Sequence, residues 1–171
     1  MATGAGEEAR GGPADRLGLL SGGEGVLTGT VVCAAVIAYA AGHVDSTLEL
    51  SVAILGTALV YWLAHLHART IGLSVTHGHH PLLALRLALA ETWPVAGASV
   101  LPVVVLLLAE LLGAGLRTAA WLALLGTVAV LTGYSWLAGA RSGLGRWGRL
   151  GSAAAGAGIG LLVALLKVAL H

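Results

Sequence analysis

The sequence predicts an all-α polytopic membrane protein, a helical bundle with five transmembrane helices. The composition is the first reason: 57% of the 171 residues are hydrophobic and only 10% are charged, whereas a soluble domain is about 25% charged. The second is that the apolar residues form five continuous runs and do not alternate with polar ones. Lipid offers no hydrogen bonds to an exposed backbone, so such runs favour helices in a lipid bilayer.

The first 24 residues are rich in Gly and Ala and include six charged residues. They offer too little apolar surface to offset the entropy of ordering. We therefore expect a flexible tail over residues 1–24 and a transmembrane domain over 25–171. A basic start followed directly by an apolar core is absent, so we expect the first helix to act as an uncleaved insertion signal.

The predicted spans cover residues 26–42, 48–66, 93–112, 118–140 and 151–170. Each is close to the 17–25 residues, roughly, that a helix needs to cross a bilayer. The sequence Ser46-Thr47-Leu48-Glu49 between the first two spans matches a capping box. The first two spans are therefore expected to form an antiparallel hairpin.

Residues 81–92 have two interpretations. Pro81 suits the first position of a helix, but one helix from Pro81 to Leu112 would be roughly 48 Å long, beyond a hydrocarbon core of about 30 Å. Pro94 also disfavours helical geometry in the residue before it. We expect a short interfacial helix, a bend near Thr92–Pro94 and a further kink at Pro102; the alternative is one long tilted helix.

The basic residues predict the orientation. With the N-terminus inside, seven of the nine Lys and Arg residues lie on the cytoplasmic side and two, Arg117 and Lys167, lie outside. We therefore expect a bacterial inner-membrane protein with a cytoplasmic N-terminus and an external C-terminus. Lys167 is close enough to the outer end of its span to extend its ammonium to the interface.

Three ionisable residues are candidates for a transport path, because such groups in a membrane are costly and usually functional. They are Glu49, His65 and Glu110. Each has a structural alternative: Glu49 can cap a helix, His65 can bond another helix or reach the interface, and Glu110 can pair with Arg117.

Five of the seven histidines lie within sixteen residues. His65 and His67 are about 200° apart around a helix and cannot bind one ion together. We expect the helix to end near His67 and a loop to present His77, His79 and His80. Imidazole suits Zn, Ni or Cu and titrates near neutrality, so this loop is a candidate metal site, with pH sensing or a plain polar loop as alternatives. No other cofactor is expected.

The segment RSGLGRWGRLG contains Arg141, Arg146, Trp147 and Arg149. Arginine beside tryptophan suits anionic lipid headgroups, although the preference for basic residues inside explains these residues equally well. The net charge of +1 gives no support to nucleic-acid binding.

Small residues recur every four positions in the first and last spans, which lets helices approach closely. The two stripes are Thr30, Ala34, Ala38 and Gly42, and Ser152, Gly156, Gly160 and Ala164. They indicate either packing inside the bundle or a contact in a homo-oligomer.

The Gly-rich and acidic tail, the Ala, Leu, Val and Gly spans and the segment VYWLAHLHART together resemble small multi-pass integral membrane proteins of actinobacteria, which have no assigned activity. Trp62 followed by His65 is also similar to a bacterial potassium-channel family, whose F-S-D-G-like motif is missing here, so its function is not carried over.

The sequence contains no nucleophile elbow, P-loop or dinucleotide-binding motif, so an enzyme is not expected. The leading hypothesis is a small transporter or channel-like protein. The alternative is a non-catalytic structural or accessory subunit of a larger membrane complex.

Overall fold

The computed structural model describes residues 23–78 and 80–170, without the side chains of residues 23, 24, 77 and 170. All the secondary structure in these ranges is helical, and the predicted tail lies almost wholly outside them. The helices are α1 (Gly23–Ala40), α2 (Thr47–His77), α3 (Pro81–Gly97), α4 (Val100–Leu111), α5 (Leu116–Arg141) and α6 (Arg146–Leu170). The predicted all-α helical bundle of membrane type is confirmed.

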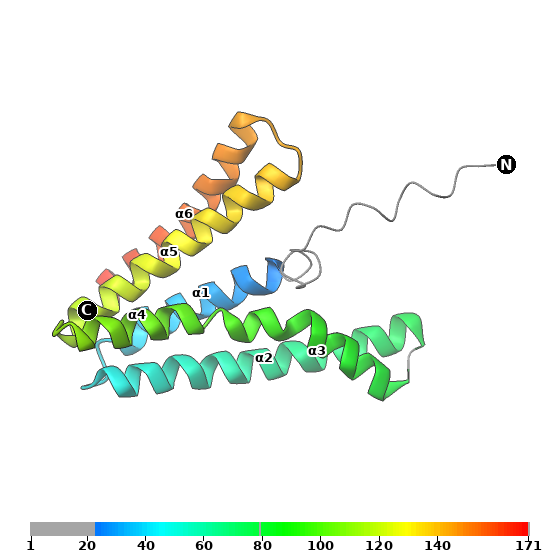
Figure 1. The fold of residues 1–171 in the computed structure, drawn as a ribbon, viewed down its shortest axis with the longest axis horizontal. Coiled ribbons are helices and arrows are strands. Elements are labelled where there is room, and N and C mark those ends of the chain that lie inside the picture. The colour runs from blue at the N-terminus through cyan, green and yellow to red at the C-terminus, as the bar shows by residue number, and fades with distance from the viewer. Residues whose placement is uncertain (1–22, 79, 171) are drawn as a thin grey trace.

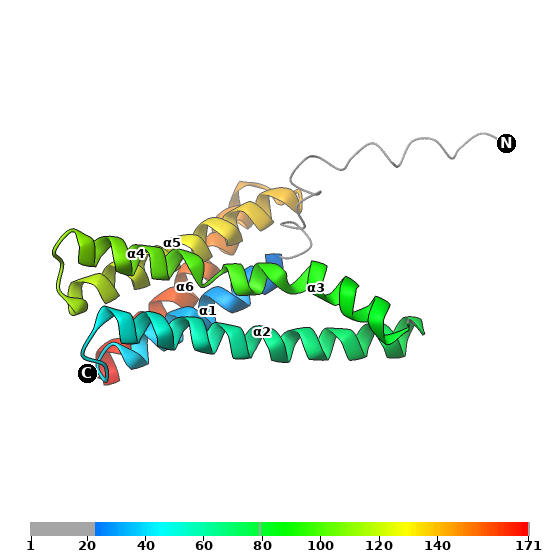
Figure 2. The same cartoon turned by 60° about the horizontal axis from the view of Figure 1, so that its bottom comes forward.

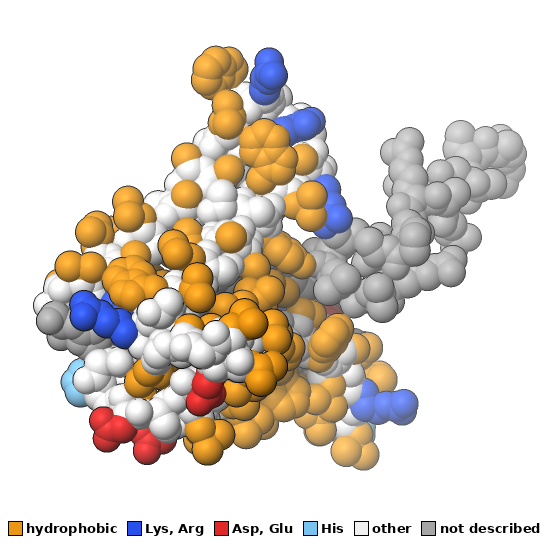
Figure 3. Space-filling model, turned by 60° about the vertical axis from the view of Figure 1, so that its left-hand side comes forward, with side chains coloured by type: hydrophobic (Ala, Val, Ile, Leu, Met, Phe, Trp, Pro, Cys, Tyr) orange, Lys and Arg blue, Asp and Glu red, His pale blue; other side chains and the backbone are white. Residues whose placement is uncertain are grey.

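Four helical segments in the described ranges are long and apolar enough to cross a membrane. They are Thr47–Thr76, Pro81–Leu111, Leu116–Arg141 and Arg146–Ala169, and a shorter apolar helix covers Gly25–Ala40. Many large apolar side chains are exposed, and on the face that Figure 3 shows they cover more of the surface than Lys, Arg, Asp and Glu do. The protein is therefore a multi-pass membrane protein.

The helices form two hairpins that meet at one end and diverge at the other (Figures 1 and 2). One hairpin is α2 with α3, and the other is α5 with α6. Helix α1 lies between them and contacts α2, α3, α5 and α6. The α1–α2 turn, the α4–α5 turn and the C-terminus all lie at the end where the hairpins meet, which we call the shared end.

Glycine permits the closest helix contacts. A Cβ at Gly29 of α1 would lie 2.7 Å from the backbone oxygen of Val95 in α3, and a Cβ at Gly156 of α6 would lie 2.8 Å from the backbone oxygen of Leu131 in α5. In the first predicted stripe, Thr30, Ala34 and Ala38 are buried. Both stripes therefore take part in packing within the chain, and a homo-oligomer contact stays a prediction.

Helix α2 is longer than predicted, because it continues past His67 to His77, where a loop was expected. Gly78 ends it, with a left-handed φ of 63° that favours glycine. The prediction placed the end where the apolar run stops. Falling hydropathy ends a membrane span, but here the helix itself stops only at a residue with special backbone geometry, and Leu73 still packs against Ala84 and Ala88 of α3.

The segment after Pro81 forms two helices, as expected, but the break lies at Ala98–Ser99 and not at Thr92–Pro94. Helix α3 continues through Pro94. The break belongs to Pro102, which has no amide hydrogen for the carbonyl of Ala98 four residues earlier and whose ring clashes with that carbonyl.

Candidate functional site

The side chain of Lys167 is buried at the shared end. It is only 4% exposed, and its Nζ has no hydrogen-bond partner, the one such buried side-chain nitrogen or oxygen in the described ranges. The prediction that Lys167 extends to the interface is therefore wrong. An unpaired ammonium in this position is unusual, because burial removes its hydration without replacing it.

Two features favour a cation at this position. Lys167 lies in the last turn of α6, where the unsatisfied backbone carbonyls of a helix attract positive charge. Its Nζ also lies 5.2 Å from the centroid of the Trp121 ring in α5, within the range of a cation–π contact. Neither feature provides a hydrogen-bond acceptor for the ammonium protons.

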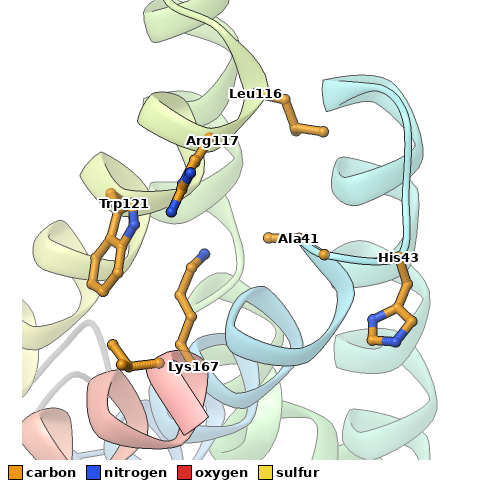
Figure 4. A pocket seen from close by; sticks show the side chains of 8 residues that line it. Ala41, His43, Leu116, Arg117, Trp121 and Lys167 are labelled. Atoms are coloured by element: carbon orange, nitrogen blue, oxygen red, sulfur yellow. The ribbon is translucent and has the colours of Figure 1, made fainter. Parts of the chain in front are cut away.

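Lys167 lines a pocket of about 730 Å³ between α6, the start of α5 and the α1–α2 turn. Figure 4 shows its ammonium pointing toward Arg117, with Ala41 to one side. The lining residues are Ala41, Gly42, His43, Leu116, Arg117, Trp121, Lys167 and Val168. These described lining residues include an arginine, a lysine and an imidazole, and none of them is a carboxylate.

Arg117 contributes the second cation from the first turn of α5. The side chain is exposed, and no side chain caps the helix at Gly115. Glu110 is exposed too and forms no salt bridge with Arg117; in the described ranges the salt bridge is Arg69–Glu91, 2.6 Å long. The expected pair does not form, since solvation at a surface offsets most of the attraction.

His43 forms the third polar part of the wall. Its Nδ1 lies 2.9 Å from the backbone oxygen of Tyr39, and its ring stacks on the Tyr39 ring with the centroids 4.6 Å apart. These contacts hold the imidazole in the turn that follows α1.

The chemistry of this pocket suits binding of an anion. Arginine and lysine both donate charge-assisted hydrogen bonds to oxyanions, and the uncapped first turn of α5 adds partial positive charge. None of the lining residues in the part of the chain that the structure describes is a carboxylate, serine or cysteine, so these residues offer none of the usual nucleophile and base pairs.

The predicted transport-path residues lie elsewhere. Ser46 caps α2 as predicted, since its Oγ accepts from the Glu49 backbone amide at 3.2 Å, but Glu49 Oε2 accepts from the Asp45 amide at 3.0 Å and not from the Ser46 amide of a regular capping box. His65 is half-buried and stacks on Tyr61, and Glu110 is exposed near the end of α4. Neither the Lys167 pocket nor the second pocket described below is lined by any of the three, and their transport role stays a prediction.

The histidine loop is only partly described. His79 and the side chain of His77 lie outside the described residues. The ring of His80 caps α3, since its Nδ1 accepts from the Leu82 amide at 3.4 Å. In the described ranges no three His, Cys, Asp or Glu residues are grouped to hold a metal, so the metal site stays a prediction.

The predicted lipid-binding residues lie at the far tip of the α5–α6 hairpin. Arg141, Arg146 and Trp147 are exposed there, and Arg149 Nε donates to the backbone oxygen of Leu144 at 2.9 Å. Their positions suit contact with headgroups, which stays a prediction.

A second pocket, of about 380 Å³, lies where α1, α3, α4 and α5 meet, with Trp93 and Tyr134 in its wall. None of its described lining residues is charged, and its polar side chains are those of Thr30, Thr127 and Tyr134. The wall is otherwise apolar and suits an apolar ligand.

None of the pocket residues was predicted from the sequence to bind a ligand or to line a transport path. One indication was present: Lys167 is the single lysine of the chain and lies within an apolar run, ALLKVAL. The other residues of the pocket could not be found, because Trp121 and His43 are distant from Lys167 in sequence. No protein family, curated protein or solved structure matches the chain.

Proposed function

We propose that this protein is a small, non-catalytic membrane transport protein for anions, and that its ligand binds in the Lys167 pocket. The supporting observation is the buried Nζ of Lys167, which lacks a hydrogen-bond partner. An ionisable group inside a membrane protein is costly and usually functional. An anion bound in the pocket supplies the missing acceptor.

The arrangement of helices suits transport. The pocket lies at the shared end, and the two hairpins diverge toward the opposite end of the molecule (Figure 1). Transporters commonly move one helical unit against another around a fixed site. Here the α5–α6 hairpin is the unit that rocks about α1.

The proposed orientation places the pocket on the outer side of a bacterial inner membrane, with the N-terminus in the cytoplasm. Away from the shared end, the α2–α3 hairpin contains Arg69 and Arg86, and the tip of the α5–α6 hairpin contains three more arginines. Of the lysines and arginines in the described ranges, Arg117 and Lys167 are the ones at the shared end. This distribution fits the excess of basic residues on the cytoplasmic side.

Cysteine labelling tests the orientation. In a Cys33→Ala background, Leu112→Cys places a thiol in the turn at the shared end, and Leu144→Cys places one at the far tip; both leucines are exposed. A membrane-impermeant maleimide added to intact cells should label the first and spare the second. Labelling of only the second thiol would reverse the orientation.

Flux through liposomes tests the function. Purified protein is reconstituted in neutral lipid, and efflux of chloride, phosphate, acetate and an aromatic carboxylate is compared with protein-free liposomes. We expect protein-dependent flux of at least one anion, which Lys167→Met lowers at least tenfold. Arg146→Met, which removes an exposed cation at the opposite end of α6, is the matched control and should keep the wild-type rate.

Two results would count against the proposal. Equal flux in wild type and Lys167→Met would exclude the pocket from the path. Anion binding without any flux would favour the accessory-subunit hypothesis. A parallel Glu110→Gln variant tests the transport-path role of Glu110, which predicts reduced flux.

A further inference from the structure

We infer that the Lys167 pocket selects an organic oxyanion joined to an apolar body, such as an aromatic carboxylate, over small inorganic anions. This inference rests on the proposed function and assigns its ligand class. It is drawn from the size of the pocket, the apolar parts of its wall, and the two cations that face the same space.

The size of the pocket exceeds what an inorganic anion fills. Its volume is about 730 Å³, and pockets of roughly 300–1,000 Å³ hold drug-sized organic ligands. Chloride or phosphate alone would leave most of this space to water. A ligand with a body of several carbon atoms fills it.

Part of the wall of the pocket is apolar. Ala41 and Leu116 line it on the side of the α1–α2 turn and the start of α5, and Trp121 and Val168 line it beside Lys167. Covering these apolar groups with an apolar body is favourable, in proportion to the area removed from water. A small hydrated anion has no apolar surface to place against these groups, so it gains no binding free energy from them.

The cationic part of the wall suits an oxyanion. Figure 4 shows the guanidinium of Arg117 and the ammonium of Lys167 turned toward each other across the pocket. Two like charges that face each other repel, and an anion between them removes the repulsion. A carboxylate has two oxygens and can accept from both groups at once, whereas a halide is a single centre without this geometry.

Trp121 belongs to the apolar part of the wall and also contacts the Lys167 ammonium. The Lys167 ammonium lies over its ring, with Nζ 5.2 Å from the centroid. A bound carboxylate draws the ammonium away, and the apolar body then covers the indole face. Binding therefore changes the surroundings of Trp121, and its fluorescence reports the event.

A matched set of probes separates the head from the body of the ligand. The probes are 3-phenylpropionate, with both parts; acetate, with the head alone; 3-phenylpropanol, with the body alone; and chloride and inorganic phosphate. Binding to the full chain in neutral-lipid nanodiscs is followed by calorimetry and tryptophan fluorescence. We expect phenylpropionate to bind at least tenfold more tightly than each of the others.

Variants assign the binding to the pocket. Lys167→Met should abolish binding of phenylpropionate, and Arg146→Met should leave it unchanged. Trp121→Leu should remove the fluorescence change and weaken phenylpropionate, with no effect on acetate. If Trp121→Leu does not fold, the comparison of Lys167→Met with Arg146→Met and with the unsubstituted protein still decides the result.

The outcomes distinguish this inference from the proposed function. If acetate, chloride or phosphate binds as tightly as phenylpropionate and its binding needs Lys167, the ligand class is wrong and the proposed function stands. If no anion binds or moves across liposomes, the proposed function fails as well. Binding of phenylpropanol equal to phenylpropionate would also overturn the inference, because the cations would then have no role.

A further comparison identifies the source of the oxyanion. If nanodiscs with anionic phosphatidylglycerol lower the phenylpropionate affinity at least tenfold relative to neutral lipid, a lipid headgroup with its acyl chains is the natural ligand of this class. If the affinity is unchanged, the ligand is a free organic acid.

Discussion

The ammonium of Lys167 lies over the ring of Trp121, and this cation–π contact links the last turn of α6 to the first part of α5. The contact offsets only part of the hydration that the ammonium loses, because cation–π contacts contribute about 0.5–2 kcal/mol. The position therefore combines a functional requirement with a cost in stability.

Lys167→Met should stabilise the protein while it abolishes anion binding. Methionine keeps an unbranched apolar stem and removes the unpaired charge without leaving a partner charge behind. Even replacing a buried ion pair by apolar groups is often neutral or stabilising by about 1–4 kcal/mol. Thermal unfolding in detergent, followed by circular dichroism, measures the change. Arg146→Met should stay within about 0.5 kcal/mol of wild type, and a lower midpoint for Lys167→Met would contradict the argument.

Thr92→Val should destabilise the α2–α3 hairpin. Trp62 Nε1 donates to Thr92 Oγ1 at 3.2 Å, and Thr92 is only 2% exposed. Valine leaves the indole N–H without a partner, which costs about 1–3 kcal/mol. The control is Thr132→Val, whose hydroxyl donates to its own helix, at Val128. Chemical unfolding should separate the two variants, and equal losses would show that the interhelical bond contributes nothing.

Gly156→Ala and Gly158→Ala should change stability in opposite directions. A Cβ at Gly156 meets the backbone oxygen of Leu131 at 2.8 Å, whereas a Cβ at Gly158 meets nothing within 4 Å. Alanine at 158 should stabilise α6 by up to about 1 kcal/mol, since it favours the helix over glycine. Alanine at 156 must push α5 and α6 apart and should lower the unfolding midpoint. Similar midpoints for the two variants would mean that the close contact does not form.

Pro102→Ala should join α3 and α4 into one helix. Alanine restores the amide donor for the Ala98 carbonyl and removes the ring that clashes with it. Spin labels at Leu85 and Leu108, both exposed, report the change by double electron–electron resonance in a Cys33→Ala background. Pro94→Ala is the control and should leave the distance unchanged, because α3 already continues through Pro94. If only Pro94→Ala alters the distance, the break belongs to Pro94.

The fold class, the four long apolar segments and the Ser46 cap could be predicted because each depends on local sequence, whereas the first of the five predicted spans is a shorter apolar helix. Apolar runs define the spans, and Ser46 and Glu49 bond within one turn of helix. The C-terminal end of α2 was predicted too early in the sequence, for a physical reason. Hydropathy describes where the bilayer ends, while a helix continues outside it until a residue such as Gly78 changes the backbone.

The sequence by itself therefore determined that this chain is a helical membrane protein, and it drew attention to the histidines between α2 and α3. Only the tertiary structure moved the candidate site to the shared end. Whether a lysine near the end of a span reaches water depends on what packs around it, and Lys167 is buried against Trp121 of α5, near the α1–α2 turn, both distant in sequence. Burial and the lack of a partner arise when these segments meet, and local sequence does not encode either one.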